Sequence, residues 1–344
     1  MHKGSTLDRK QQLEDWLKIN LKQAFTLTTA SADASFRHYF RVHLSQQYLD
    51  GLTLIAMDAP PPQEDCTPFI NVAKLLLDAG LNVPKVIAQD LQNGFLLLSD
   101  LGDDTYLSQL NQDNALKLYG DATSALIKIQ LASKAHDLPP YDEALLTREM
   151  QLFPDWYVSK HLNFELNSEQ QGWLQQAFDA LNKNILAQGQ VTVHRDYHSR
   201  NLMICQGVNG HNPGILDFQD AVYGPITYDL VSLLKDAYIQ WDEEQIIDWA
   251  VRYWQPAKKA GLPVPDDFSE FYRDFEWMGA QRHIKVLGIF ARLSHRDGKD
   301  GYLKDMPLVM HYLRKVCERY VELRPMLRLL DALEGRVPRP KYVV

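Results

Sequence analysis

The sequence predicts an α+β protein with two lobes, a small antiparallel-sheet lobe followed by a larger lobe that is mostly α-helical. Short alternating or apolar segments fill much of the first part of the chain, whereas apolar residues recur at helical spacing in most of the remainder. The pattern changes near residues 99–104, where an apolar run gives way to a polar stretch that contains glycine. The lobes are therefore expected to span residues 1–100 and 101–344.

The first lobe is expected to begin with a helix and to continue as a sheet. Between residues 7 and 25, apolar residues recur with the period of a surface helix. Strands are predicted from alternating or apolar segments at 36–44, 52–58, 85–90 and 94–98. The last two strands are joined by a turn at Gln92–Gly94. A helix inserted at 69–79 ends at Gly80, a residue type that commonly terminates helices.

The second lobe shows long helical periods from about residue 106 onward. Helices are predicted at 114–131, 168–186, 228–238, 243–254, 268–294 and 306–320. Strand patterns in this part occur only around one polar segment, at 191–193, 202–205 and 214–216. No internal repeat or low-complexity linker is present in the sequence.

Composition narrows the function class. A chain of 344 residues with 45% hydrophobic residues can bury a substantial core. A formal charge of -8 disfavours nucleic acid as the main partner, because phosphate backbones attract basic surfaces. Cys66, Cys205 and Cys317 are widely spaced, which favours neither a disulfide framework nor a zinc site. No apolar run reaches membrane-spanning length and no obligate protein partner is evident, so a soluble cytoplasmic protein is expected.

The polar segment His194–Asn201 carries the most specific pattern in the sequence. It has the H-R-D-x-x-x-x-N spacing of a phosphotransferase catalytic loop, and Asp217 follows at the end of a short apolar strand. Transfer of a γ-phosphoryl group needs a carboxylate to accept the proton of the attacking hydroxyl, and Asp196 fits that role. It also needs oxygen ligands for Mg²⁺, which Asn201 and Asp217 can supply. Any one of these residues alone would more often form a turn, but together they favour a site.

On these residues, the chain resembles the aminoglycoside phosphotransferase and choline kinase-like family, the small-molecule relatives of the protein kinases. Further stretches resemble the bacterial anomeric kinases that phosphorylate N-acetylmuramate and N-acetylglucosamine in cell-wall recycling: Ala34–Arg41, Met57–Pro61 and Leu97–Gly102. The resemblance covers nearly the whole chain. It implies a protein-kinase-like two-lobed fold, ATP and Mg²⁺ as cofactors, and an amino sugar as the small-molecule substrate.

Two other functions are compatible with the same motif. One is an aminoglycoside, choline or homoserine kinase of the same fold, whose cationic acceptor would require an acidic cleft. The other is a pseudokinase that binds nucleotide as a scaffold. It is suggested by the strand at 53–58, which lacks the usual phosphate-binding lysine and has Met57 near its place.

The resemblance places the adenine at the crossover between the lobes, where the backbone of Leu98, Ser99, Asp100 and Leu101 would meet its edge. No G-x-G-x-x-G stands near the N-terminus; Ser35, Phe36 and Arg37 occupy the expected phosphate cover, and the Ser35 hydroxyl can donate to a phosphate oxygen. On the following strand Arg37, Tyr39 and Arg41 share one face, which is therefore cationic. Arg37 and Arg41 are expected either to contact phosphate or to be solvated charges on an edge strand. Lys74 or Arg37 could replace the missing lysine, and Glu64 is either an ion-pair partner or a surface carboxylate.

The acceptor side is less specific. An N-acetylmuramate substrate carries a lactyl carboxylate, so a nearby cation would be useful. The positions considered for substrate binding are His198, Arg200, Asp220, Arg282 and His283. Each could instead be an ordinary surface or ion-pair residue. Asp229, at the head of a predicted helix, is expected to cap that helix or to bond the backbone of the catalytic loop.

Overall fold

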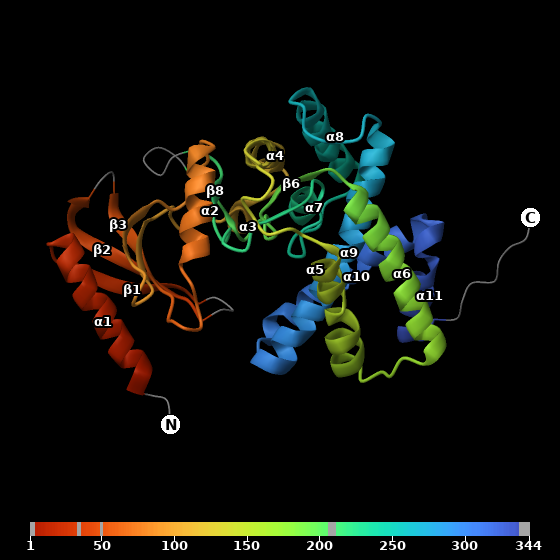
Figure 1. Ribbon diagram of the computed structural model, residues 1–344, viewed down its shortest axis with the longest axis horizontal. Coiled ribbons are helices and arrows are strands. Elements are labelled where there is room, and N and C mark those ends of the chain that lie inside the picture. Colours follow the sequence, from red (N-terminus) through yellow and green to blue (C-terminus); the bar gives the residue numbers. More distant parts are fainter. Residues whose placement is uncertain (1–3, 33–35, 49–50, 206–210, 337–344) are drawn as a thin grey trace, which may run out of the picture. The chain divides into compact units, whose positions relative to one another are not determined.

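The computed structural model describes residues 4–32, 36–48, 51–205 and 211–336. The chain divides into two compact units. Unit 1 contains Met1–Ala132 and Arg200–Asp220, and unit 2 contains Ser133–Ser199 and Ala221–Val344. Unit 1 holds an antiparallel sheet and unit 2 is mostly helical (Figure 1), which confirms the predicted α+β class. No helix in the described ranges combines the length and apolar character needed to cross a membrane.

The sheet of unit 1 has the strand order β1-β2-β3-β5-β4, and all neighbouring strands are antiparallel. The strands are β1 (Phe25–Ala32), β2 (His38–Tyr48), β3 (Gly51–Asp58), β4 (Val86–Asp90) and β5 (Phe95–Ser99). The four predicted strands are confirmed, whereas β1 was not predicted. In the turn between β4 and β5, Gly94 has a φ of +73°, and a Cβ there would lie 1.9 Å from the carbonyl oxygen of Ala59. Only glycine fits this position.

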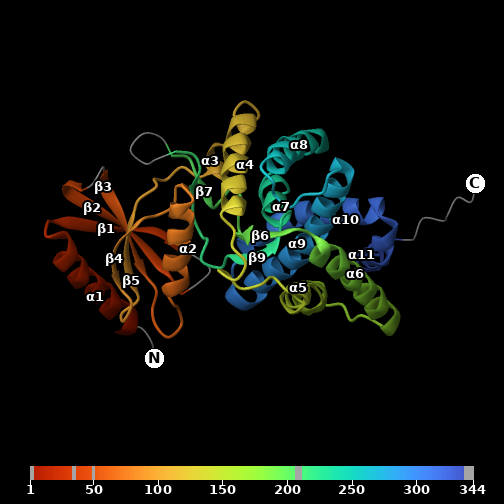
Figure 2. The same ribbon diagram turned by 45° about the horizontal axis from the view of Figure 1, so that its top comes forward.

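Two helices cover opposite faces of this sheet (Figure 2). Helix α1 (Gly4–Leu21) places Leu13, Leu17 and Leu21 in a core with residues of β2, β3 and β5. Helix α2 (Thr67–Asp78) buries Phe69, Val72, Ala73 and Leu76, which recur at helical spacing. Both helices were predicted, and α1 ends four residues earlier than expected because β1 begins at Phe25.

The segment after the catalytic motif is also part of unit 1. Strands β7 (Leu202–Met203) and β8 (Gly214–Ile215) pair with each other. Backbone hydrogen bonds join this hairpin to the rest of the unit, from Ile204 to Asp104 at 2.7 Å and from Ile215 to Asn82 at 2.8 Å. The remaining helices of the unit are α3 (Tyr106–Gln109) and α4 (Ala115–Leu131). The compact units therefore divide the chain at positions other than residue 100, and the lobe boundary stays a prediction.

Unit 2 is built around a long helix, α9 (Phe268–Asp297), that is buried on all sides from residue 275 to residue 288. Strand β6 (Gln190–Val193), which leads into the catalytic motif, pairs with β9 (Val222–Pro225). The helices are α5 (Glu143–Met150), π-helix η1 (Phe153–His161), α6 (Ser168–Ala187), α7 (Tyr228–Leu234), α8 (Glu243–Lys259), 3₁₀-helix η3 (Asp300–Asp305), α10 (Met306–Arg319), 3₁₀-helix η4 (Val321–Leu323) and α11 (Arg324–Leu333). Helices α5, η1 and α11 and strand β9 were not predicted.

Candidate active site

The backbone of the catalytic motif is held by one buried carboxylate. The amides of His194 and Arg195 donate to the two oxygens of Asp229, at 2.7 and 3.0 Å. Asp229 lies in the first turn of α7 and is fully buried. Burial raises the pKa of the Asp229 carboxyl to about 7, although the two amide donors act in the opposite direction. Arg195 has a φ of +77°, so the chain changes direction immediately before Asp196. This contact confirms the predicted bond between Asp229 and the loop backbone.

Asp196 lies among cationic groups of unit 2. Burial raises the pKa of its carboxyl, but the charges of Lys285, Arg282, His198 and His194 outweigh burial and lower it below its ordinary value. Lys285 and Arg282 both belong to α9. The Asp196 carboxylate therefore stays ionised at neutral pH, as the predicted role of proton acceptor requires.

The cations around Asp196 are fixed by partners of their own. The Nζ of Lys285 is 2.9 Å from Oε1 of Glu149 and 2.9 Å from the hydroxyl of Tyr228. Glu149 also accepts from Arg195 and from the hydroxyl of Tyr141. These contacts form a buried network that joins α5, α7 and α9 to the catalytic motif. None of these network residues except Arg195 lies in the motif, so motif spacing could not select them.

The residues of unit 2 that were predicted to bind the acceptor substrate lie in different surroundings. Arg282 lies 5.6 Å above the ring of Tyr228, and its Nη1 is 3.4 Å from the carbonyl oxygen of Arg195. His283 is 2% exposed and stacks on Tyr312, and burial followed by the charge of Lys235 lowers its pKa to about 3. His198 is partly exposed and meets the ring of Tyr238 edge-on at 5.6 Å. His283 thus packs in the core, whereas His198 remains accessible.

Unit 1 contains a cavity of about 360 Å³ that brings together most of the predicted nucleotide and metal residues. Its lining includes the predicted Leu98, Ser99, Asp100, Leu101, Arg200, Asn201 and Asp217. Its apolar walls include Ile55, Phe69, Met203 and Leu216, which come from four separate segments and carried no motif signal. An apolar slot with polar groups at one side suits a flat nucleobase.

Asn201 and Asp217 lie together at this cavity. The amide Nδ2 of Asn201 is 3.2 Å from Oδ2 of Asp217, and the backbone carbonyl of Asn201 accepts from Leu216 at 2.9 Å. The side chain of Gln219 donates to the other oxygen of Asp217 at 2.7 Å. A carboxylate and an amide carbonyl are hard oxygen donors, so the pair fits Mg²⁺. Within the described ranges, no group of three or more histidine, cysteine, aspartate or glutamate residues is placed to hold a metal ion. Mg²⁺ at a polyphosphate commonly takes phosphate and water oxygens as its other ligands.

The segment of residues 98–103 at this cavity is held by Arg41 of β2. Its Nε is 2.7 Å from Oδ2 of Asp100, its Nη2 is 3.0 Å from the carbonyl of Gly102, and it also pairs with Asp103. Asp100 in turn accepts from the amide of Gly102 at 2.9 Å. Tyr39 and Arg41 both line the cavity, which confirms that they share a strand face. Arg41 makes ion pairs with the segment and its side chain is 16% exposed, so it is not a solvated edge-strand charge, whereas its contact with phosphate stays a prediction.

Of the three residues predicted to cover the phosphates, the structure describes Phe36 and Arg37. Ser35 lies outside the described residues, and Phe36 is 64% exposed. The Nη2 of Arg37 is 2.9 Å from Oε2 of Glu64, whose other oxygen accepts from the amide of Phe36 at 3.2 Å. Burial lowers the pKa of Arg37, but the fields of Tyr39, Glu64 and Asp220 raise it overall. Glu64 is therefore the ion-pair partner of Arg37 and not a surface carboxylate without a partner. Lys74, the other candidate for the missing lysine, is exposed on α2.

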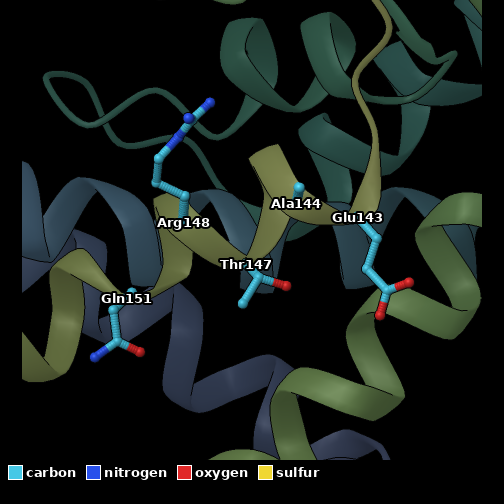
Figure 3. Close-up of a pocket in the computed structure, with 5 residues that line it drawn as sticks. All are labelled: Glu143, Ala144, Thr147, Arg148 and Gln151. Carbon is cyan, nitrogen blue, oxygen red and sulfur yellow. The ribbon is translucent and has the colours of Figure 1, made fainter.

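A second hollow, of about 620 Å³, lies along α5 in unit 2 (Figure 3). All of its labelled residues come from α5 or the residue that follows it: Glu143, Ala144, Thr147, Arg148 and Gln151. It is an open surface with neither a buried titratable group nor a residue of the catalytic motif. The chemistry is therefore assigned to the surroundings of Asp196 and to the cavity of unit 1.

Known proteins with similar sequences are kinases. The chain is 47% identical to the N-acetylmuramate/N-acetylglucosamine kinase of Neisseria meningitidis serogroup B, over 96% of this chain and 97% of that protein. It is 48% identical to the kinase of the same name from Pseudomonas aeruginosa, over 94% of this chain and 97% of that protein.

Solved structures support the same fold. An ADP-bound aminoglycoside phosphotransferase matches with a TM-score of 0.56 at 14% identity, covering 89% of this chain and 98% of the other. This likeness confirms the protein-kinase-like fold. The model of the phosphotransferase enzyme family matches residues 26–263, and the catalytic motif lies within that range. The chain belongs to the phosphotransferase enzyme family.

Proposed function

We propose that this enzyme transfers the γ-phosphoryl group of ATP to the anomeric hydroxyl of N-acetylmuramate and N-acetylglucosamine. The observation that carries the proposal is nearly full-length identity of 46 to 48% to three kinases named for these two sugars. Similarity of this extent includes the acceptor side of the chain as well as the catalytic motif. We place the reaction in the cytoplasm, where ATP is available and where the free thiols Cys66, Cys205 and Cys317 would stay reduced.

In this reaction Asp196 accepts the proton of the attacking hydroxyl. An anomeric hydroxyl is more acidic than an ordinary alcohol, so a weak base is sufficient if it is ionised and correctly oriented. The cations Lys285 and Arg282 keep the carboxylate ionised, and Asp229 fixes the backbone that carries it. Orientation therefore contributes more here than basicity.

ATP is assigned to the cavity of unit 1. The backbone of Ser99, Asp100 and Leu101 would meet the adenine edge, and Arg41 holds this segment in place. Asn201 and Asp217 would hold Mg²⁺, which neutralises charge on the polyphosphate when bound. Arg37 is the cation we assign to the phosphates, together with Ser35 and Phe36, because its pairing with Glu64 matches the arrangement expected of the missing lysine. Arg200 lines the same cavity, and we assign it to the phosphate side.

The acceptor side favours a neutral or anionic substrate. A polycationic aminoglycoside or a choline would meet the positive charges of Arg195, Arg282 and Lys285 around Asp196, and like charges in a partly desolvated site repel. His198 and Asp220 remain assigned to substrate binding. His283 is left out because its ring is packed against Tyr312.

The test is release of ADP by the purified enzyme with Mg-ATP and a panel of acceptors. The panel contains N-acetylmuramate, N-acetylglucosamine, kanamycin, choline and homoserine, and ³¹P NMR identifies the phosphorylated carbon. We expect turnover with the two sugars and a 1-phosphate product. Asp196→Asn should lower kcat by at least about 100-fold, because it removes the proton acceptor. Asp248→Asn, an exposed aspartate of α8, is the matched control and should leave kcat unchanged.

Two outcomes would contradict the proposal. Turnover with the amines alone would keep the phosphotransferase activity and reject the substrate. Absence of turnover across the panel, despite ATP binding, would support the nucleotide-binding scaffold instead.

A further inference from the structure

One face of α9 runs from Asp196 toward solvent. Arg282 and Lys285 lie on this face, and both act on the Asp196 carboxyl. Residues spaced by three, four or seven along a helix share a face, so Ile289 and Arg292 continue it. Every residue of α9 from 275 to 288 is buried, whereas Ile289 and Arg292 are partly exposed. The helix face beside the catalytic base therefore becomes accessible at these two positions.

Among the described residues Arg292 has no anionic partner, unlike other arginines of α9. Within residues 4–32, 36–48, 51–205 and 211–336, its side chain makes no hydrogen bond or ion pair, and its Nε is buried. Burial and the charge of Arg296 lower its pKa, and the weaker field of Asp297 does not compensate. On the same helix, Arg296 pairs with Asp297 at 2.7 Å and Arg273 pairs with Glu322 at 2.8 Å.

A partly buried guanidinium without a counter-ion is unfavourable, because it loses hydration without gaining a charged hydrogen bond. An arginine in this state is well suited to a carboxylate, which it can bind through two parallel hydrogen bonds. The ligand that would relieve Arg292 is therefore an anion that enters along the accessible face of α9.

The loop that carries Asp196 is linked to the same stretch of α9 through Tyr238, on the side of the helix away from Arg292. His198, two residues after Asp196, contacts Tyr238 at 5.6 Å, and Tyr238 contacts Phe290 of α9 at 6.2 Å. Lys285 and Arg292 are seven residues apart, which corresponds to about 10 Å along the helix axis. An arginine side chain is long enough to cover part of this distance, and a hexose with a three-carbon acid substituent covers the rest.

We propose that Arg292 determines acceptor specificity by binding the carboxylate of the lactyl group that distinguishes N-acetylmuramate from N-acetylglucosamine. This inference rests on the proposed function, since it assigns a part of the same substrate. It assigns no role in phosphoryl transfer itself. Arg292 then acts on binding of one sugar, while the chemistry at Asp196 is common to both.

The test compares kcat and KM for both sugars in the wild type, Arg292→Gln and Arg292→Lys. Loss of a charged hydrogen-bonded pair corresponds to about a 10- to 100-fold change in an equilibrium constant. We expect Arg292→Gln to lower kcat/KM for N-acetylmuramate by this factor, mainly through KM, and to change the value for N-acetylglucosamine by less than about threefold. Arg292→Lys should recover part of the loss because it restores the charge without the planar fork.

Two comparisons make the assignment specific. The methyl ester of N-acetylmuramate has no carboxylate, so the wild type and Arg292→Gln should use it equally well. Arg273→Gln removes the same charge from a distant turn of α9 and should leave kcat/KM for both sugars unchanged.

If Arg292→Gln lowers kcat/KM equally for both sugars, or for neither, the assignment of Arg292 is overturned. An unchanged preference of Arg292→Gln for the acid over its ester would overturn it as well. The failure of the proposed function is distinguishable, because in that case the wild-type enzyme would phosphorylate neither sugar.

Discussion

At the scale of single residues, the surroundings of Asp196 set a compromise between ionisation and basicity. A carboxyl group that is largely removed from water would be protonated at neutral pH if it were alone. Lys285 and Arg282 prevent this, at the cost of making Asp196 a weaker base. Such a base suits a hydroxyl that loses its proton readily, as an anomeric hydroxyl does.

Replacing Arg282 with glutamine should shift the pH dependence of catalysis. The positive charge of Arg282 lowers the pKa of Asp196, so its loss should raise that pKa. The acid limb of kcat/KM should then move to higher pH, since the base becomes protonated sooner as pH falls. The measurement is kcat/KM for N-acetylglucosamine between about pH 3 and 7, a range that includes the ordinary pKa of an aspartate.

The control is Arg273→Gln, which removes an arginine from α9 without contact with the catalytic motif. Its acid limb should coincide with that of the wild type. If the limb of Arg282→Gln also coincides with it, Arg282 does not act on the ionisation of Asp196.

Single residues also differ in how far they could be predicted. Asp196, Asn201 and Asp217 could be selected because their spacing along the chain carries the pattern. Arg41 and Asp100 are separated by 59 residues, and nothing near either of them indicates the other. The contact between Lys285 and Glu149 is of the same kind, since it joins two helices that are distant in sequence. Partners brought together only by the fold leave no local signal.

At the scale of elements, the 3.6-residue recurrence of apolar residues predicted most of the helices. Elements whose apolar residues do not follow a regular spacing, such as β1 and η1, were missed. Strand β1 is Phe25–Ala32, in which the alternation of apolar and polar residues is interrupted at Thr28–Thr29 and continues only with alanine, close to where its pairing with β2 shifts in register. Helix η1 is a π-helix that begins with a proline at its second residue, so its wider turns do not give the 3.6-residue period. Helix α9 was found because its apolar residues keep that period around the buried polar groups.

Helix α9 packs closely at Gly288 against the backbone of Leu152, the residue before η1, so a larger residue at position 288 should destabilise the protein. A Cβ at Gly288 would lie 2.4 Å from the backbone carbon of Leu152, so Gly288→Ala requires the two elements to separate. We expect a loss of about 1–3 kcal/mol in the free energy of unfolding, because overpacking strains a close-packed interior. The free energy of unfolding of the wild type and the variant is measured by urea denaturation.

The matched control is Gly172→Ala in helix α6. No atom lies within 4 Å of a Cβ placed there, so alanine should be neutral or stabilise the helix by up to about 1 kcal/mol. Equal stability of the two variants would contradict the close packing at Gly288.

At the scale of the whole molecule, the residues proposed for the reaction are divided between the two compact units. Unit 1 contains the cavity lined by Asn201 and Asp217, and unit 2 contains Asp196 with its buried network. The chain crosses from one unit to the other between Ser199 and Arg200, inside the catalytic motif. The motif spacing predicted that Asp196, Asn201 and Asp217 serve one reaction. It did not predict that Asp196 would belong to one unit and the other two residues to the other, because spacing does not specify which segments pack together.

This division predicts that Mg-ATP binding and catalysis can be separated by mutation. A ligand at about 100 times its Kd stabilises the folded state by about 2.7 kcal/mol. Because the cavity lies in unit 1, Asp196→Asn should keep the full rise in Tm with Mg-ATP while losing turnover. Asp217→Asn, which retains the side-chain shape at a positive φ, should lose the part of the rise that depends on Mg²⁺. Asp113→Asn, an exposed aspartate of unit 1, should behave like the wild type. Loss of the nucleotide effect in Asp196→Asn would show that the cavity of unit 1 is not sufficient to hold ATP, and the assignment of the nucleotide to that unit would have to be abandoned.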